Sequence, residues 1–179
     1  MSGTPNRHTE LAVVECVARV VCQNGPMRVS AKADYALRAL IELAAAPEEK
    51  RALSAEALGQ RQDIPHGFLQ AILADLRKAG IVLSQRGQSG GWRLARDAAE
   101  VSVADVIRAV DGPLVSVYGL RPESVKYHDN AEVLQHVWIA ARDSLREVFE
   151  QVSIAQLASR DLPEAVTSRT RSDEAWQSH

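Results

Sequence analysis

The chain has 179 residues, of which 46% are hydrophobic and 25% charged, values typical of one globular domain with or without an interaction segment, and unlike disordered or fibrous chains. No stretch approaches the roughly 18 consecutive apolar residues of a membrane-spanning helix, so we expect no membrane association. The formal net charge of −2 combines a basic block, residues 27–96 with +4, and an acidic block, residues 97–179 with −6, which weakly favours a module that binds a polyanion.

The first 26 residues differ from the rest of the chain. They begin with a polar stretch, end in the breaker Asn24-Gly25-Pro26 and are followed at once by Met27. We therefore interpret residues 1–26 as an extension without stable structure; the alternative is a short amphipathic element that packs on the main domain. Both cysteines of the chain, Cys16 and Cys22, lie here. Two cysteines cannot form a disulfide framework, so we expect a cytoplasmic protein.

The basic block predicts a helix-turn-helix followed by a β-hairpin. Apolar residues recur at helical spacing over residues 30–46 and, more briefly, over 54–60. After a tight turn, a third helix is predicted from Pro65, which suits a first helical position, to a stop at Gly80. Residues 81–83 and 92–94 read as strands joined by the glycine-rich turn 86–91, which is typical of the wing of a winged helix. Residues 27–96 are thus the predicted DNA-binding domain in a mainly α fold.

The acidic block predicts a linker helix and a dimerisation helix within residues 97–158. Ser102 and Asp105 resemble a capping box at the start of a helix that ends near Val110. After a loop over residues 114–130, a long helix is expected from about 131 to 151. Its apolar side chains step by four and three residues, the pattern of a helix that packs on another helix. We interpret this seam as a homodimer interface; the alternative is packing on the chain's own winged helix. The seam consists of Leu134, Trp138, Ala141, Leu145, Val148 and Val152.

Residues 153–158 read as one or two further helical turns, and residues 159–179 as a polar tail that we expect to be disordered.

The third helix of a helix-turn-helix enters the DNA major groove with its N-terminal residues. Here these residues include His66, Gly67 and Gln70, and Gln70 is suited to bind adenine through both atoms of its amide. Gly67 lowers helix stability, which makes sense where the backbone must approach the duplex closely; a plain turn residue is an equally good reading. Arg86, at the wing tip, is suited to enter a narrow minor groove.

Other basic residues are weaker candidates. Lys32, Arg77 and Lys78 are placed to reach phosphates, but each is about as well explained as a solvated surface charge. Arg93 ranks below Arg86, because a returning strand can point its side chain away from DNA.

Enzyme chemistry finds no support in the sequence. The glycine-rich turn lacks the lysine of a phosphate-binding loop and leads into a strand. No paired carboxylates, Ser-His-Asp arrangement or His-Glu-x-x-His motif occurs. We therefore predict a protein that is not an enzyme and holds no metal. The one alternative is a metal site formed by His128, Asp129 and His136.

Four segments, residues 27–36, 76–82, 86–94 and 103–112, closely resemble the Rrf2 family of bacterial transcription regulators, the group of IscR, NsrR and CymR. The resemblance spans about residues 27–158, and the Arg-Gly-x-x-Gly-Gly-aromatic wing signature is its most specific part. It implies a homodimeric winged-helix repressor or activator that binds inverted-repeat operators and pairs through the long C-terminal helix. The DNA contacts that it implies are Lys32, Tyr35, Gly67, Phe68, Gln70, Arg86 and the wing residues Gln88 and Ser89.

The chain departs from the family pattern at the cofactor. Sensing members carry three cysteines between the two C-terminal helices, where they hold an iron–sulfur cluster, but residues 112–133 contain none. The sequence therefore resembles the cluster-free branch, whose members respond to a partner protein, a small molecule or thiol chemistry, and we expect no cluster here.

The resulting hypothesis is a homodimeric regulator of transcription that binds double-stranded DNA and an unknown effector. Two alternatives remain open: a winged helix that binds another protein, and a metal-dependent or cluster-dependent sensor of the same family.

Overall fold

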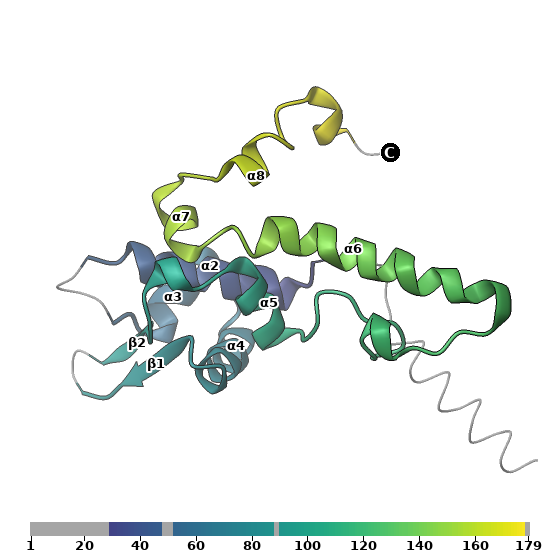
Figure 1. The fold of residues 1–179 in the computed structure, drawn as a ribbon. Coiled ribbons are helices and arrows are strands. Elements are labelled where there is room, and N and C mark those ends of the chain that lie inside the picture. Colours follow the sequence, from purple (N-terminus) through teal and green to yellow (C-terminus); the bar gives the residue numbers. More distant parts are fainter. Residues whose placement is uncertain (1–28, 48–51, 88–89, 178–179) are drawn as a thin grey trace, which may run out of the picture.

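A computed structural model describes residues 29–47, 52–87 and 90–177 (Figure 1). The predicted extension, residues 1–26, and the wing residues Gln88 and Ser89 lie outside this part. The chain is mostly helical, with one antiparallel hairpin of two strands, which confirms the predicted fold class. In chain order its helices and strands are α2 (Ala31–Ala45), α3 (Ala55–Gln62), α4 (His66–Lys78), β1 (Val82–Gln85), β2 (Gly91–Leu94), α5 (Val103–Val110), α6 (Val133–Phe149), α7 (Ile154–Ser159) and α8 (Glu164–Thr167), with short 3-10 turns at Ala98–Glu100, Pro122–Ser124, Asp129–Glu132 and Asp173–Trp176.

Serine side chains begin several helices, because a serine oxygen can accept from an otherwise unpaired backbone N–H of the first turn. Ser30 and Ser54 cap α2 and α3 as predicted, and Ser102 forms a full capping box with Asp105 at the start of α5. A second capping box, at Ser153, opens α7 and was not predicted. Pro65 differs slightly from expectation: its ψ of 131° is extended, so it stands at the N-cap and α4 begins one residue later.

The core lies where α2, α4 and α5 meet. Helix α4 contributes four side chains that are fully buried, Leu69, Ile72, Leu73 and Leu76. Burying each such leucine or isoleucine stabilises the fold by roughly 1.5–3 kcal/mol. The facing side of α2 presents small residues beside Leu40, so the two helices approach closely. This packing fixes which face of α4 remains outside.

The hairpin is held against the domain by glycines and by Leu53. The strand register pairs Val82 with Leu94 and Leu83 with Arg93. Trp92 exchanges two backbone hydrogen bonds with Leu53, of 2.8 and 2.9 Å. At Gly91, which has φ +155°, a Cβ atom would lie 2.5 Å from the Leu53 carbonyl oxygen. A glycine is therefore required at this point of the wing.

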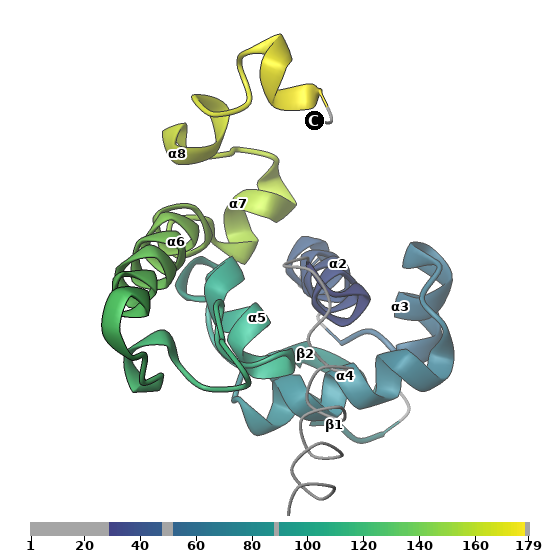
Figure 2. The same cartoon turned by 90° about the vertical axis from the view of Figure 1, so that its right-hand side faces the viewer.

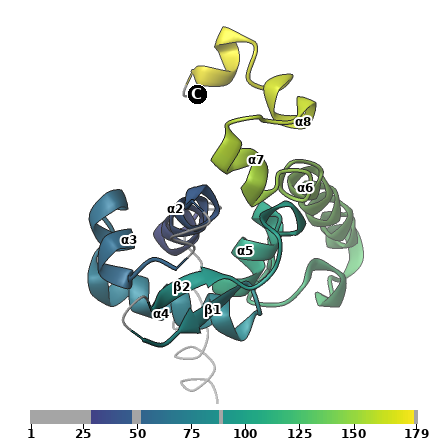
Figure 3. The same cartoon turned by 90° about the vertical axis from the view of Figure 1, so that its left-hand side faces the viewer.

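Helix α6 runs along one side of the molecule, and α5 lies between it and the group α2, α3 and α4 (Figures 2 and 3). Gln135 of α6 donates to the carbonyls of Pro122 and Val125 at 3.2 and 3.3 Å, which attaches the preceding loop to the helix. None of the seventeen residues of α6 is buried within the single chain.

The C-terminal tail is not structureless, contrary to expectation. It contains α8 and a 3-10 turn at Asp173–Trp176. Val166 packs against the core cluster, and Arg169 pairs with Glu147 of α6 at 2.8 Å. The polar composition of the tail conceals these few anchoring contacts.

Candidate nucleic-acid interface

Helix α4 presents one face to solvent at the lower edge of the molecule, beside the hairpin (Figures 1 and 3). Its first turn is exposed at His66, Gly67, Phe68 and Gln70, the residues predicted to reach base edges. The side chains of Gln70 and His66 lie 3.4 Å apart, nitrogen to nitrogen. Because the hydrophobic face of α4 is fully occupied by the core, this polar first turn is free to enter a groove.

Gly67 has no structural reason to be glycine within the described chain. A Cβ atom built there would meet nothing within 4 Å, and its φ lies outside the left-handed region. An alanine would fit and would favour the helix. The open space is compatible with both interpretations of Gly67, a close approach by the duplex and a turn residue at the helix entry.

Tyr35 and Phe68 form an aromatic pair between α2 and α4. Their ring centroids are 6.4 Å apart at an interplanar angle of 66°, and the Arg38 guanidinium lies 5.4 Å from the Tyr35 centroid. Phe68 nevertheless remains 60% exposed. Such an apolar ring at the surface, beside polar groups, is suited to contact a thymine methyl group or a sugar.

Lys32 lies in the first turn of α2, as predicted, but its ammonium group already has partners within the chain. Its Nζ lies 2.7 Å from Asp75 Oδ2 of α4 and donates to the carbonyl of Val110 of α5, also at 2.7 Å. The hydrogen bond from Lys32, followed by the one from Lys78, holds the pKa of the Asp75 carboxyl below its ordinary value of 3.8. Lys32 therefore fastens three helices together, and we leave it out of the proposed phosphate contacts.

The remaining basic candidates are exposed. Lys78 reaches Asp75 at 3.3 Å but keeps 77% of its side chain in solvent. Arg77 and Arg86 are exposed and have no ion-pair partner in the described ranges. Arg93 is exposed on the hairpin, opposite Leu83, and donates to the carbonyl of Leu94 at 3.4 Å. The wing and α4 thus present cations on adjoining surfaces.

Three residues on the surface formed by α4 and the wing were not predicted from the sequence. Ala71 of α4 is exposed and Ala74 of α4 is half-buried, and Gln85 is exposed at the end of β1. Helical spacing was a usable signal for the two alanines, because residues four apart share a face: Ala71 follows Gly67 by four residues and Ala74 follows Gln70 by four.

The side chains of the predicted seam of α6 are only partly exposed to solvent. Leu134 is 40% exposed, and the neighbouring Val133 and Val137 are 65% and 53% exposed. Trp138 donates its indole N–H to the Tyr127 hydroxyl at 3.0 Å. Val152 was wrongly placed in the seam: it lies beyond the end of α6 and is buried in the chain's own core. Ala141, Leu145 and Val148 are half-buried.

The part of the chain that the structure describes contains no cysteine that could ligate an iron–sulfur cluster. The segment between α5 and α6, residues 112–133, supplies no thiolate. Within the described ranges, no three His, Cys, Asp or Glu side chains gather in a metal-binding group, and this includes His128, Asp129 and His136. No described helix is both long and apolar enough to cross a bilayer.

Comparison with known proteins agrees with this geometry. Residues 29–160 match the family model Rrf2, described as an iron-dependent transcriptional regulator. The chain is 43% identical over 140 residues to the HTH-type regulator Rv1287 of Mycobacterium tuberculosis, covering 78% of this chain and 86% of the relative. It is 31% identical over 133 residues to CymR of Bacillus subtilis, covering 74% and 91%.

Solved structures agree as well. The structure of B. subtilis CymR, titled the global cysteine regulator, matches with a TM-score of 0.63 at 29% identity, covering 74% of this chain and 97% of that one. IscR of T. potens matches with a TM-score of 0.60 at 28% identity, covering 84% and 96%. These relatives are regulators and not enzymes, and their fold is the winged helix. The chain belongs to the Rrf2 family of transcriptional regulators.

Proposed function

We propose that this regulator acts as a homodimer that binds an inverted-repeat operator in double-stranded DNA and does so without an iron–sulfur cluster. In each half-site the first turn of α4 enters the major groove, and Arg86 of the wing enters the adjacent minor groove. The observation that carries the proposal is the exposed first turn of α4, whose Gly67 faces open space beside Gln70.

Dimerisation is supported by the state of α6. A helix of seventeen residues with an apolar stripe and no buried side chain is incomplete in a single chain. A second copy covers Val133, Leu134 and Val137 in a two-fold interface, because a symmetric contact buries the same patch on both copies. Two recognition helices then face successive grooves of a palindrome, about one helical turn or a multiple of it apart.

The absence of cysteine from residues 112–133 supports regulation without a cluster. Cluster ligation in such proteins depends on thiolates, and the only two in the chain, Cys16 and Cys22, precede the family domain. The signal that the protein senses must then be of another chemical kind.

The test is a footprint of the full chain on the DNA upstream of its own gene, with the mass of the complex measured by light scattering. We expect two protected half-sites with two-fold symmetry and two chains per operator. An absorption spectrum of the same sample, prepared without oxygen, should show no cluster bands. A single unpaired footprint, one chain per site or a brown cluster-containing protein would each contradict the corresponding part of the proposal.

A further inference from the structure

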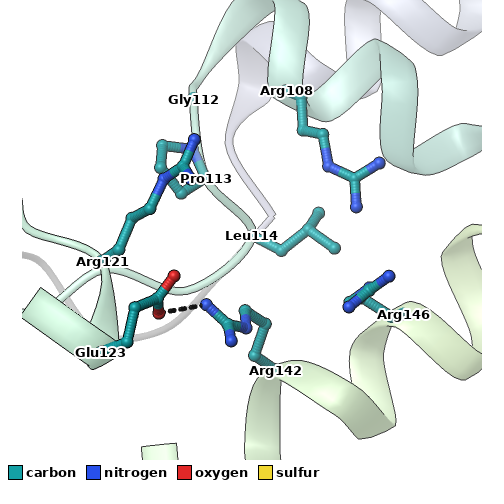
Figure 4. A pocket seen from close by; sticks show the side chains of 8 residues that line it. All are labelled: Arg108, Gly112, Pro113, Leu114, Arg121, Glu123, Arg142 and Arg146. Carbon is teal, nitrogen blue, oxygen red and sulfur yellow. Dashed lines mark hydrogen bonds and ion pairs between the residues drawn. The ribbon is translucent and has the colours of Figure 1, made fainter. Parts of the chain in front are cut away.

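A cleft of about 520 Å³ opens between the end of α5, the loop after it and α6 (Figure 4). Its size falls within the range of small-molecule sites. Four arginines line it: Arg108 from α5, Arg121 from the loop, and Arg142 and Arg146 from successive turns of α6. None belongs to the DNA-facing surface described above.

The cleft holds more positive than negative charge. Glu123 pairs with Arg142 at 2.5 Å, and Glu150 pairs with both Arg146 and Arg108. Arg108 also meets Asp105 at 3.7 Å, but Asp105 is shared with Arg96 at 3.9 Å. Within the described ranges Arg121 has no carboxylate within ion-pair distance. With Asp105 and its second partner Arg96 included, five arginines face the three carboxylates of Asp105, Glu123 and Glu150, an excess of two positive charges.

The hydrogen bond to Glu150 raises the pKa of Arg146, so this arginine is held as a cation. The remaining excess of positive charge, to which Arg121 contributes, makes the cleft complementary to an anion. Arginine remains protonated under all ordinary conditions and binds carboxylate or phosphate groups through two parallel hydrogen bonds. In Figure 4, Arg108 and Arg146 approach each other near Leu114, while Arg121 stands on the opposite wall. An anion with two charged groups can bridge these walls, with Leu114 as the apolar part of the lining.

We propose that this cleft binds a small organic anion that carries two or more carboxylate or phosphate groups, and that this anion is the effector of the regulator. The role of the anion as effector rests on the proposed function. The wall helix α5 packs against the recognition helix α4 in the core. Lys32 adds a polar link between them, because it donates to the Val110 carbonyl at the end of α5 and pairs with Asp75 of α4. An anion that draws Arg108 and Arg146 away from Glu150 changes how α5 and α6 are held, and so the placement of α4.

The test is calorimetric titration of the full chain with citrate and, separately, with pyrophosphate, which distinguishes carboxylate from phosphate recognition. We expect saturable binding of at least one probe. Arg121→Gln removes an exposed guanidinium that makes no ion pair in the described part of the chain, so the variant should fold and bind about tenfold more weakly. The matched control is Arg61→Gln on α3, whose ion pair with Glu42 is remote from the cleft; it should bind like the wild type.

Absence of saturable binding of both probes, or equal weakening in both variants, would overturn the site. The effector role is tested by operator affinity over a series of anion concentrations. The affinity should change by about tenfold in the wild type, and the same change should need about tenfold more anion in Arg121→Gln. Equal operator affinity with and without anion would overturn that role. If the anion binds but no operator is recognised, the proposed function fails and the cleft assignment stands. If the operator is bound and neither probe is, only this inference fails.

Discussion

At the scale of single residues, Gly67 separates what the fold needs from what DNA needs. The chain leaves open space around its Cα atom, and helix formation alone would favour alanine there. Within the described residues, the space beside Gly67 is open to a close approach by the DNA backbone. Gly91, in contrast, is required by the fold itself, because the backbone of Leu53 occupies the space that a Cβ atom would need.

Gly67→Ala should leave the thermal stability unchanged or raise the free energy of unfolding by up to about 1 kcal/mol. Operator binding should weaken by about 1–3 kcal/mol, comparable to one lost base contact. Thermal melting and fluorescence anisotropy on the same preparation measure the two quantities. A variant that binds the operator as tightly as the wild type would show that Gly67 is a helix-entry residue and nothing more.

The interactions of the Asp75 carboxylate with Lys32 and Lys78 should make the stability of the fold depend on pH. The pKa of Asp75 lies below the ordinary value of 3.8 because Lys32 and Lys78 stabilise the carboxylate. A depressed pKa contributes stability that is fully present above the unfolded value and lost as the pH falls through the folded value. Asp75→Asn should therefore melt below the wild type at pH 7, and the difference should shrink below about pH 4. A difference that is constant down to the acid limit would contradict the ion pair's role.

At the scale of elements, the wing depends on the strand pairing with Leu53. Gly91→Ala places a Cβ atom against the Leu53 backbone, which must shift, so we expect a lower melting temperature and weaker DNA binding together. Gly87→Ala is the control for open space, since nothing lies within 4 Å of its Cβ position, although its φ of +114° still adds strain. Thermal melting should rank Gly91→Ala as the more damaging change; the reverse ranking would contradict the close approach.

Helix α6 is predicted to be the dimer interface. Val137 is 53% exposed in the single chain, so Val137→Glu should leave the fold intact and break the two-fold contact by burying an unpaired charge. Light scattering at micromolar concentration should show a monomer, while the exposed-site control Ala99→Glu remains a dimer. A dimer in both variants would place the interface elsewhere.

The sequence predicts the elements well where local signals are strong. Ser30, Ser54 and Ser102 begin helices as expected, and the four leucine and isoleucine residues of α4 are buried as their spacing indicates. Local signals fail where the deciding contact is distant. Lys32 resembled a free surface cation until the fold placed Asp75, 43 residues away, beside it.

Distant contacts also explain why Val152 was assigned to the seam and why the arginine cleft was not predicted. Val152 continued the helical pattern, but α6 ends at Phe149 and the chain then turns back to the core. Arg142 and Arg146 are four residues apart, so their shared face was readable from the sequence. Arg108 and Arg121 come from a different helix and a loop, and only the packing of α5 beside α6 brings them to the same cleft.

At the scale of the whole molecule, operator binding requires the wing and α4 to meet one duplex together. Phosphate neutralisation by cations makes the affinity fall with salt, with a slope that counts the contacts. An arginine outside this surface serves as the control for a wing variant. Arg171 lies in the C-terminal tail and pairs with Glu164 of α8, so Arg171→Ala should bind DNA like the wild type.

The most direct test is the affinity of Arg86→Ala for the operator, measured by anisotropy over a series of salt concentrations. We expect a loss of about 1–3 kcal/mol and a salt slope smaller by about 1, with Arg171→Ala unchanged. An Arg86→Ala protein with the affinity and the salt slope of the wild type would contradict the claim that the wing binds DNA.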